Sequence, residues 1–165
     1  MQNRTRSNSR GFSLIEVVIV VVIIGVIAAI AIPRMSRGAA AARDAALKQD
    51  LTLLRNAVDL YTAEHDNTVP PFTGVATHLT GYSNFDADAA QAAKDTTHYF
   101  GPYIKAIPAL PVGSNKGDAT FADGTGGAPQ IAGGAGWWYD ENTGTVKANL
   151  ADTEVDDAGV QYNAY

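Results

Sequence analysis

The sequence contains no cysteine among its 165 residues, which excludes disulfide bonds and thiolate chemistry. It also lacks the catalytic patterns G-x-S-x-G and H-E-x-x-H and the phosphate-binding pattern G-x-x-x-x-G-K-[ST]. The three histidines, His65, His78 and His98, are scattered along the chain, and we interpret them as surface residues rather than metal ligands. We therefore expect a protein that is not an enzyme.

Basic residues are scarce toward the C-terminus. Residues 117–165 carry eight acidic side chains and one basic side chain, Lys147. Such a surface is anionic and a poor partner for the phosphate backbone of nucleic acids. We expect no nucleic acid as a main ligand.

A long apolar run dominates the N-terminal region. Residues 12–32 are interrupted only by Ser13, Glu16 and Gly25, and a helix of this length spans a hydrocarbon core of ~30 Å. A short polar segment that contains Arg4, Arg6 and Arg10 precedes the run. Because an acid at the centre of a bilayer costs roughly 3 kcal/mol, Glu16 must be compensated.

Three simpler interpretations of the run compete. A secretory signal peptide would use the small residues of the segment Ala29–Ala31, but the run is longer than a usual signal peptide and contains an acid. A plain single-pass membrane anchor explains the length of the run but does not explain the presence of Glu16. A buried core helix is disfavoured because a chain of this size cannot enclose a helix that is apolar on every side.

The residues Gly11-Phe12-Ser13-Leu14-Ile15-Glu16, followed by the apolar run to Pro33, resemble the leader of the type IV prepilin superfamily, which includes pilins and type II secretion pseudopilins. The resemblance implies that a prepilin peptidase cuts between Gly11 and Phe12 and that Phe12 becomes the methylated first residue. The absence of cysteine excludes the disulfide-bounded loop of many pilins and favours a pseudopilin.

Cleavage at this position would give each subunit an ammonium group on Phe12 and a carboxylate on Glu16 at the same apolar end. The two charges of neighbouring subunits could neutralise each other, and an unpaired charge in a bundle of low dielectric would be costly. We therefore interpret Glu16 as the residue that sets the assembly register. The alternative is an acid tolerated near the membrane interface, where charges cost less.

The second half of the helix follows a different pattern. Gly25 and Pro33 predict a kink, since proline removes a backbone donor. Beyond it, apolar residues recur every three or four positions, and we expect this stripe to form the core of a domain: Leu47, Leu51, Leu54, Val58 and Tyr61. The opposite side is polar: Arg43, Asp44, Lys48, Gln49, Arg55 and Asp59. The helix should end between Glu64 and Asn67, before Pro70.

The remaining residues predict little regular structure. We expect a short helix within residues 86–98, an extended edge segment over 99–111, a long loop over 113–136 and a hairpin over 136–150, with Trp137 or Trp138 on the helix stripe. The stretches GPYIKAIP and WWYDENTGTVKAN resemble major pseudopilins, in which a late acidic loop binds calcium. Asp118 and Asp123, or the acids of residues 152–157, are weak calcium candidates here, because the loop sequence of the family is missing. A solvated acidic surface is the simpler interpretation, and no other cofactor is expected.

The expected fold class is α+β, a pilin-like fold with a long kinked N-terminal helix packed on a small antiparallel β-sheet domain. We expect a leader (1–11), a membrane and filament-core half-helix (12–33), an amphipathic half-helix (34–66) and a β-rich domain (67–165). A helix from Phe12 to Glu64 would extend about 80 Å at 1.5 Å per residue, too long for one small domain.

The expected function is that of a structural subunit, inserted in the inner membrane and polymerised into a helical pilus or a periplasmic pseudopilus. The resemblance implies as partners further copies of the chain, the prepilin peptidase, an inner-membrane assembly platform, minor pilins or pseudopilins, and membrane lipid. The alternative function is an extracytoplasmic binding module that is anchored by one helix and does not polymerise.

Overall fold

The computed structural model describes residues 12–87, 89–125, 127 and 134–165, with the backbone alone at residues 32–34, 36 and 37. The chain forms two compact units, Met1–Ala39 and Ala40–Tyr165. The leader, with Gly11, lies outside the described residues. The unit that begins at Ala40 contains every strand of the structure's described part.

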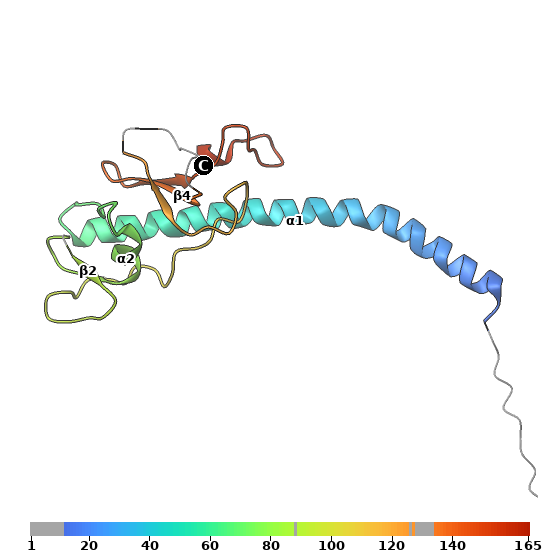
Figure 1. Ribbon diagram of the computed structural model, residues 1–165, viewed down its shortest axis with the longest axis horizontal. Coiled ribbons are helices and arrows are strands. Elements are labelled where there is room, and N and C mark those ends of the chain that lie inside the picture. The colour runs from blue at the N-terminus through green and yellow to red at the C-terminus, as the bar shows by residue number, and fades with distance from the viewer. Residues whose placement is uncertain (1–11, 88, 126, 128–133) are drawn as a thin grey trace, which may run out of the picture. The chain divides into compact units, whose positions relative to one another are not determined.

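The first element is the helix α1, Leu14–Glu64 (Figure 1). It ends where the sequence predicts: Asp66 and Asn67 follow with φ of 50° and 65°, a left-handed backbone that terminates a helix. The backbone is helical through Gly25 and Pro33. The kink at these residues stays a prediction.

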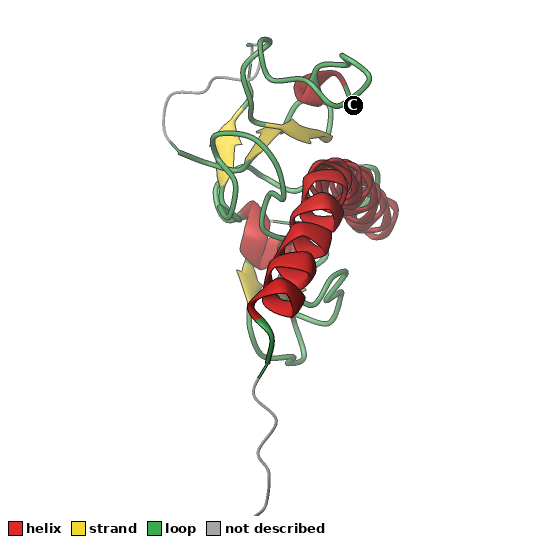
Figure 2. Ribbon diagram, turned by 90° about the vertical axis from the view of Figure 1, so that its right-hand side faces the viewer, coloured by secondary structure: helices red, strands yellow, loops and turns green. Residues whose placement is uncertain are grey.

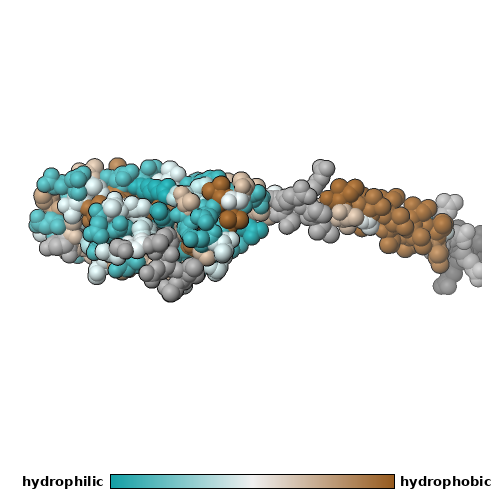
Figure 3. All heavy atoms as spheres, turned by 90° about the horizontal axis from the view of Figure 1, so that it is seen from above, coloured by the Kyte–Doolittle hydropathy of each residue, from teal (hydrophilic) through white to brown (hydrophobic). Residues whose placement is uncertain are grey.

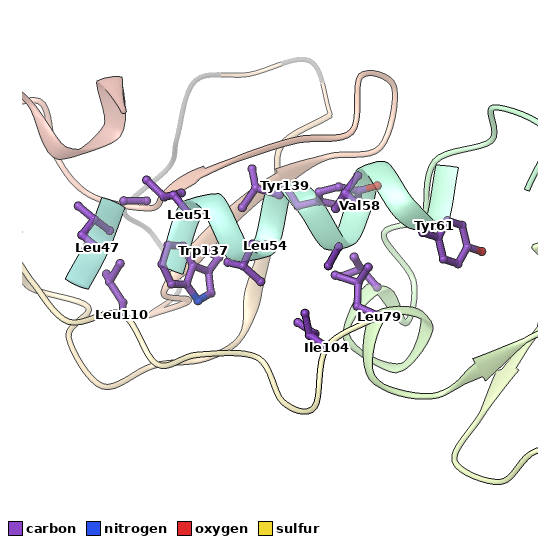
Figure 4. Packing of buried hydrophobic residues seen from close by; sticks show 14 of the residues in the cluster. Leu47, Leu51, Leu54, Val58, Tyr61, Leu79, Ile104, Leu110, Trp137 and Tyr139 are labelled. Atoms are coloured by element: carbon purple, nitrogen blue, oxygen red, sulfur yellow. The ribbon is translucent and has the colours of Figure 1, made fainter. Parts of the chain in front are cut away.

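The predicted apolar stripe of α1 forms the core of the second unit. Its five side chains are at most 3% exposed: Leu47, Leu51, Leu54, Val58 and Tyr61. They belong to one apolar cluster with Trp137, Tyr139 and Leu110 (Figure 4). Spacing by three and four residues keeps these side chains on one side of the helix, so the period read from the sequence becomes the packing surface.

A three-stranded sheet covers part of this stripe. It consists of β3 (Phe121–Asp123), β4 (Trp137–Asp140) and β5 (Thr145–Ala148), in that order, and Figure 2 shows the strands beside α1. Strands β4 and β5 form the predicted hairpin, with Tyr139 opposite Val146. Alternation along β4 directs Trp137 and Tyr139 into the core, where both are 0% exposed. The prediction that a tryptophan packs on the stripe is confirmed by Trp137.

The α+β fold class is confirmed, with one detail that the sequence did not indicate. Strand β3 pairs with β4 in parallel, Phe121 lying opposite Trp137, so the sheet is mixed rather than purely antiparallel. The segment 113–136 is therefore a loop interrupted by a short strand. Its residues 126 and 128–133 lie outside the described part.

The prediction of a helix within residues 86–98 is wrong. The described residues there form turns and the short strand β2 (Ala90–Gln91), which pairs with β1 (Tyr82–Ser83). The carboxylate of Asp95 accepts hydrogen bonds from the backbone amides of Thr97 and His98, at 2.8 and 2.6 Å. Such side-chain bonds to nearby amides compete with helix formation.

Other elements differ less from expectation. A short helix that the sequence analysis missed, α2 (Val75–Thr80), buries Val75 and Leu79. Residues 99–111 contain no strand in their described backbone and contribute a single bridge, between Ser83 and Phe100. The 3-10 helix η1 (Tyr162–Ala164) follows β5.

The face of α1 that was expected to be polar is partly covered. Asp44 is 8% exposed and accepts a 2.8 Å hydrogen bond from the hydroxyl of Tyr162. The guanidinium of Arg55 donates to the carbonyl of Val146 at 3.0 Å and to the carbonyl of Tyr165. These contacts attach the last residues of the chain to α1, and they show that two of the charged positions have structural partners.

Candidate functional site: the N-terminal apolar helix

The first turn of α1 contains the residues that the sequence analysis selected. The carbonyl of Ser13 accepts hydrogen bonds from the amides of Glu16 and Val17, at 3.0 and 3.3 Å, so Ser13 occupies the N-cap position. Glu16 then lies three residues after the cap, where the free amides and the helix dipole favour a negative charge. The helix start thus provides a local reason for an acid at this position, alongside the proposed role in assembly.

The segment that follows is apolar on all sides. The window Leu14–Ala31 has a mean hydropathy of 3.2, and none of it is buried within the chain. Its large side chains are about half exposed or more, from Leu14 at 82% to Ile30 at 59%, and Figure 3 shows a continuous hydrophobic surface here. Since exposed apolar patches on soluble monomers rarely exceed a few hundred Å², this surface requires a lipid or protein environment.

Phe12 and Glu16 border the same shallow apolar groove, together with Val17, Val20 and Val21. No hydrogen bond or ion pair to the Glu16 carboxylate is found among the described residues. The geometry therefore places the backbone nitrogen of Phe12 and the carboxylate at one end of one helix. Both are accessible to another molecule.

The remaining predicted positions can be located only in part. Gly11, which would precede the cleaved bond, is outside the described residues, and Phe12 is 83% exposed. A Cβ atom added to Gly25 would meet nothing within 4 Å, so packing within one subunit does not require glycine there. The assignments of cleavage, methylation and assembly to these residues stay predictions.

The carboxylates of the two calcium candidates, Asp118 and Asp123, accept hydrogen bonds from groups of the chain itself. Asp118 Oδ1 accepts hydrogen bonds from the hydroxyl of Thr120 at 2.6 Å, the amide of Thr120 at 2.7 Å and the amide of Gly136 at 3.1 Å. These donors, those of Thr120 above all, lower the pKa of the Asp118 carboxyl. Asp123 Oδ1 accepts from the amide of Thr125 at 2.8 Å, and Thr125 lowers its pKa in the same way.

The structure does not bring these two carboxylates into one cluster. Asp118 precedes β3 and Asp123 is its last residue, so the strand separates them. Three of the four acids of residues 152–157 also accept hydrogen bonds within the chain: Asp152 from Asn163, Glu154 from Ser114, and Asp156 from Tyr165. Within the described residues, no group of three or more His, Asp or Glu side chains could hold a metal ion.

The interpretation of the histidines as surface residues is wrong for two of them. His65 and His78 are 1% and 4% exposed. Nδ1 of His65 donates to the carbonyl of Tyr61 at 2.7 Å, because that carbonyl can only accept, and the hydroxyl of Ser83 donates to Nε2 at 3.0 Å. Nδ1 of His78 is 3.1 Å from the Tyr61 hydroxyl. These bonds give the buried histidines structural roles at the end of α1.

A signal for His65 was present in the sequence. It lies four residues after Tyr61 and so continues the spacing of the buried stripe. Its ring stacks on that of Tyr61, with centroids 3.9 Å apart. His98 does lie near the surface, where its Nδ1 is 3.0 Å from Asp95 Oδ1.

Comparison with known proteins gives two kinds of match. A family model described as the prokaryotic N-terminal methylation motif matches residues 6–32. The type II secretion system core protein G of Escherichia coli (strain K12) is 30% identical over 112 residues, which cover 68% of this chain and 72% of the relative. The Aeromonas hydrophila protein of the same name is 31% identical over 114 residues, or 69% and 73% of the two chains.

A third relative, the type II secretion system core protein G of Vibrio cholerae serotype O1, is 32% identical over 107 residues, which cover 64% of this chain and 66% of the relative. No solved structure matches the chain. The similarity to these relatives thus extends well beyond the residues of the methylation motif.

Proposed function

The chain belongs to the family of the type II secretion system core protein G, and we propose that it is the pseudopilus subunit of a secretion system. It is a structural filament subunit, inserted in the membrane by its N-terminal helix. The observation that carries this function is the exposed apolar segment Leu14–Ala31 with its single acid, Glu16. Its surface fits first a bilayer and then a bundle of identical helices.

We propose that the prepilin peptidase cuts between Gly11 and Phe12 and methylates Phe12. The methylation-motif match over residues 6–32 supports this step. Mass spectrometry of the membrane-extracted protein should give a mature N-terminus at methylated Phe12. A protein that retains residues 1–11 would refute the processing step.

In the proposed filament, residues 12–33 form the core and the ammonium of Phe12 on one subunit pairs with Glu16 of its neighbour. The groove that Phe12 and Glu16 share supports this pairing. Each charge is costly without its partner in the low dielectric of a helix bundle, so the wrong register is penalised. We propose Gly25 and Pro33 as the positions where the helix bends to accommodate this packing.

The decisive experiment removes the negative charge of Glu16 and keeps the shape of its side chain. Glu16→Gln should insert in the inner membrane at normal levels and form no filament, and secretion of extracellular proteins should fail. Ser13→Ala is the matched control, because it alters the same helical turn without changing a charge. A Glu16→Gln protein that supports normal secretion and assembly would favour the anchored, non-polymerising binding module instead.

Deletion of the gene separates the two filament types. Loss of secretion with unchanged surface fibres is expected for a pseudopilus. Lost surface fibres with unaffected secretion would assign the chain to a true pilus. Minor pseudopilins and an inner-membrane assembly platform are the further partners that we propose, and the function requires no catalytic step and no cofactor.

A further inference from the structure

A small polar pocket lies where α1, the loop 112–116 and η1 meet, and the proposed function does not use it. We name it the α1–η1 pocket. It belongs to the unit that begins at Ala40, and its lining includes Arg43, Asp44, Val112, Lys116 and Tyr162. Its volume is about 170 Å³, which equals roughly five or six water molecules at ~30 Å³ each. The pocket therefore fits a small polar group.

Asp44 supplies the negative charge of the α1–η1 pocket. It is 8% exposed, and its carboxylate accepts hydrogen bonds from the hydroxyl of Tyr162 at 2.8 Å and from the amide of Asp157 at 3.4 Å. No ion pair to this carboxylate is found in the part of the chain that the structure describes. A carboxylate offers about four acceptor sites, so Asp44 retains capacity for a ligand that donates hydrogen bonds and carries a positive charge.

Arg43 and Lys116 supply two positive charges to the same pocket. Both residues are exposed, and no hydrogen bond or ion pair of the Lys116 ammonium is found among the described side chains. A purely anionic ligand would be attracted by Arg43 and Lys116 and repelled by Asp44, and a purely cationic ligand would experience the reverse. A ligand that carries both charges satisfies all three side chains.

Phosphoethanolamine has the two charged groups that this lining requires. Its phosphate suits the guanidinium of Arg43, which binds phosphate through two parallel hydrogen bonds, and the ammonium of Lys116. Its primary ammonium has three N–H donors for the carboxylate of Asp44 and the hydroxyl oxygen of Tyr162. A quaternary ammonium has no N–H group and would leave both acceptors unfilled.

The sequence indicates a membrane lipid as the source of this group. Ala40, which also lines the pocket, lies only nine residues after Ala31, the last residue of the apolar window. Arg34 and Arg37 lie between them, and basic residues beside a membrane segment are attracted to lipid phosphates. We propose that the α1–η1 pocket binds the phosphoethanolamine headgroup of a membrane lipid. The inference rests on the proposed function, in which α1 inserts in the membrane, and adds a contact that holds the domain at the membrane before assembly.

The test measures the lipid that the full chain retains. The subunit is solubilised with equal amounts of phosphatidylethanolamine, phosphatidylcholine and phosphatidylglycerol, and native mass spectrometry counts each lipid bound. Phosphatidylcholine has the same phosphate with a quaternary ammonium, and phosphatidylglycerol has the phosphate alone. Phosphatidylethanolamine should be retained about tenfold over either, because only its ammonium donates to Asp44. Equal retention of phosphatidylethanolamine and one of the other lipids would overturn the proposal.

Variants of the pocket assign the binding to its residues. Asp44→Asn and Lys116→Gln should each lower the retention of phosphatidylethanolamine about tenfold. Because Lys116 is exposed, Lys116→Gln should keep the melting temperature of wild type and so tests the pocket even if Asp44→Asn unfolds the chain. Lys105→Gln is the matched control, since Lys105 is exposed and does not line the pocket. An equal loss in this control would overturn the proposal.

Free O-phosphoethanolamine distinguishes a lipid headgroup from a soluble ligand. Added in excess to wild type, it should displace bound phosphatidylethanolamine. If wild type binds O-phosphoethanolamine and retains the three lipids equally, the pocket takes a soluble ligand and the lipid assignment fails. A subunit without any lipid preference that still assembles and supports secretion overturns this inference and leaves the proposed function intact. If wild type does not insert in a membrane, both fail.

Discussion

The hydroxyl of Tyr162 donates a 2.8 Å hydrogen bond to the carboxylate of Asp44, which joins η1 to α1 across 118 residues of sequence. Asp44 is 8% exposed, so its carboxylate depends on this donor and on the amide of Asp157 at 3.4 Å. The contact fixes the C-terminal segment to α1.

Tyr162→Phe should lower the free energy of unfolding of the second unit. The substitution removes the donor and leaves a nearly buried carboxylate short of a partner, which costs about 1 to 2 kcal/mol. Urea unfolding of the detergent-solubilised chain, followed by tryptophan fluorescence, measures the change. Tyr82→Phe is the control, because no hydrogen bond of the Tyr82 hydroxyl is found among the described residues. Equal losses in both variants would refute a specific role for Tyr162.

Tyr162 should also make the stability of the second unit depend on pH in the alkaline range. Burial and the neighbouring Asp44 raise the pKa of Tyr162 from 10.0 to about 12. Since the folded state holds this proton more tightly, its contribution to stability is present below pH 10 and is lost as the pH rises toward 12. Unfolding midpoints measured across this interval should fall less steeply for Tyr162→Phe than for wild type, and parallel curves would contradict the assignment.

Two adjacent leucines should lose very different amounts of stability on truncation to alanine. Leu54→Ala opens a cavity in the core, where Leu54 is 0% exposed, and should cost about 2 to 5 kcal/mol of unfolding free energy. Leu53→Ala, at 44% exposed, should change it by less than about 1 kcal/mol. Chemical denaturation of both variants checks the assignment of the buried stripe; similar losses would mean that the two faces of α1 are not distinguished.

The buried hydroxyl of Ser83 should contribute more to the free energy of unfolding than an exposed hydroxyl does. Ser83→Ala leaves Nε2 of the buried His65 without its donor, and the expected loss is about 1 to 3 kcal/mol. Thr52→Ala is the control, because its hydroxyl bonds the carbonyl of Lys48 on an exposed helix surface. The ring NMR signals of His65 should shift in the first variant and stay in place in the second, and an unchanged spectrum would contradict the hydrogen bond.

The sequence predicted those elements whose pattern is local. The stripe from Leu47 to Tyr61 and the hairpin of β4 and β5 follow from periods of about 3.6 and 2, which one segment specifies by itself. The parallel pairing of Phe121 with Trp137 joins separate segments, and no local pattern reports it. The turn at Asp95 depends on a carboxylate that binds nearby backbone amides. The sequence analysis missed this turn because the composition of the segment is favourable to a helix.

The candidate site was selected on a single local feature. Glu16 was chosen because it is the one acid in a long apolar run, and the helix start at Ser13 adds a local reason for the acid that the sequence analysis did not give. The buried histidines were missed because each has hydrogen-bond partners on other elements that the sequence order does not place beside it.

Calcium should leave the stability of the chain unchanged. Hydrogen bonds from Thr120 and Gly136 occupy Oδ1 of Asp118, and Asp123 lies at the other end of β3. Among the described residues, no group of three or more His, Asp or Glu side chains could hold a metal ion. Thermal unfolding in millimolar calcium and in excess chelator should therefore give the same midpoint, for wild type and for Asp118→Asn alike. A midpoint that rises with calcium in wild type and not in Asp118→Asn would instead identify Asp118 as a ligand, because only binding to the folded state raises the midpoint.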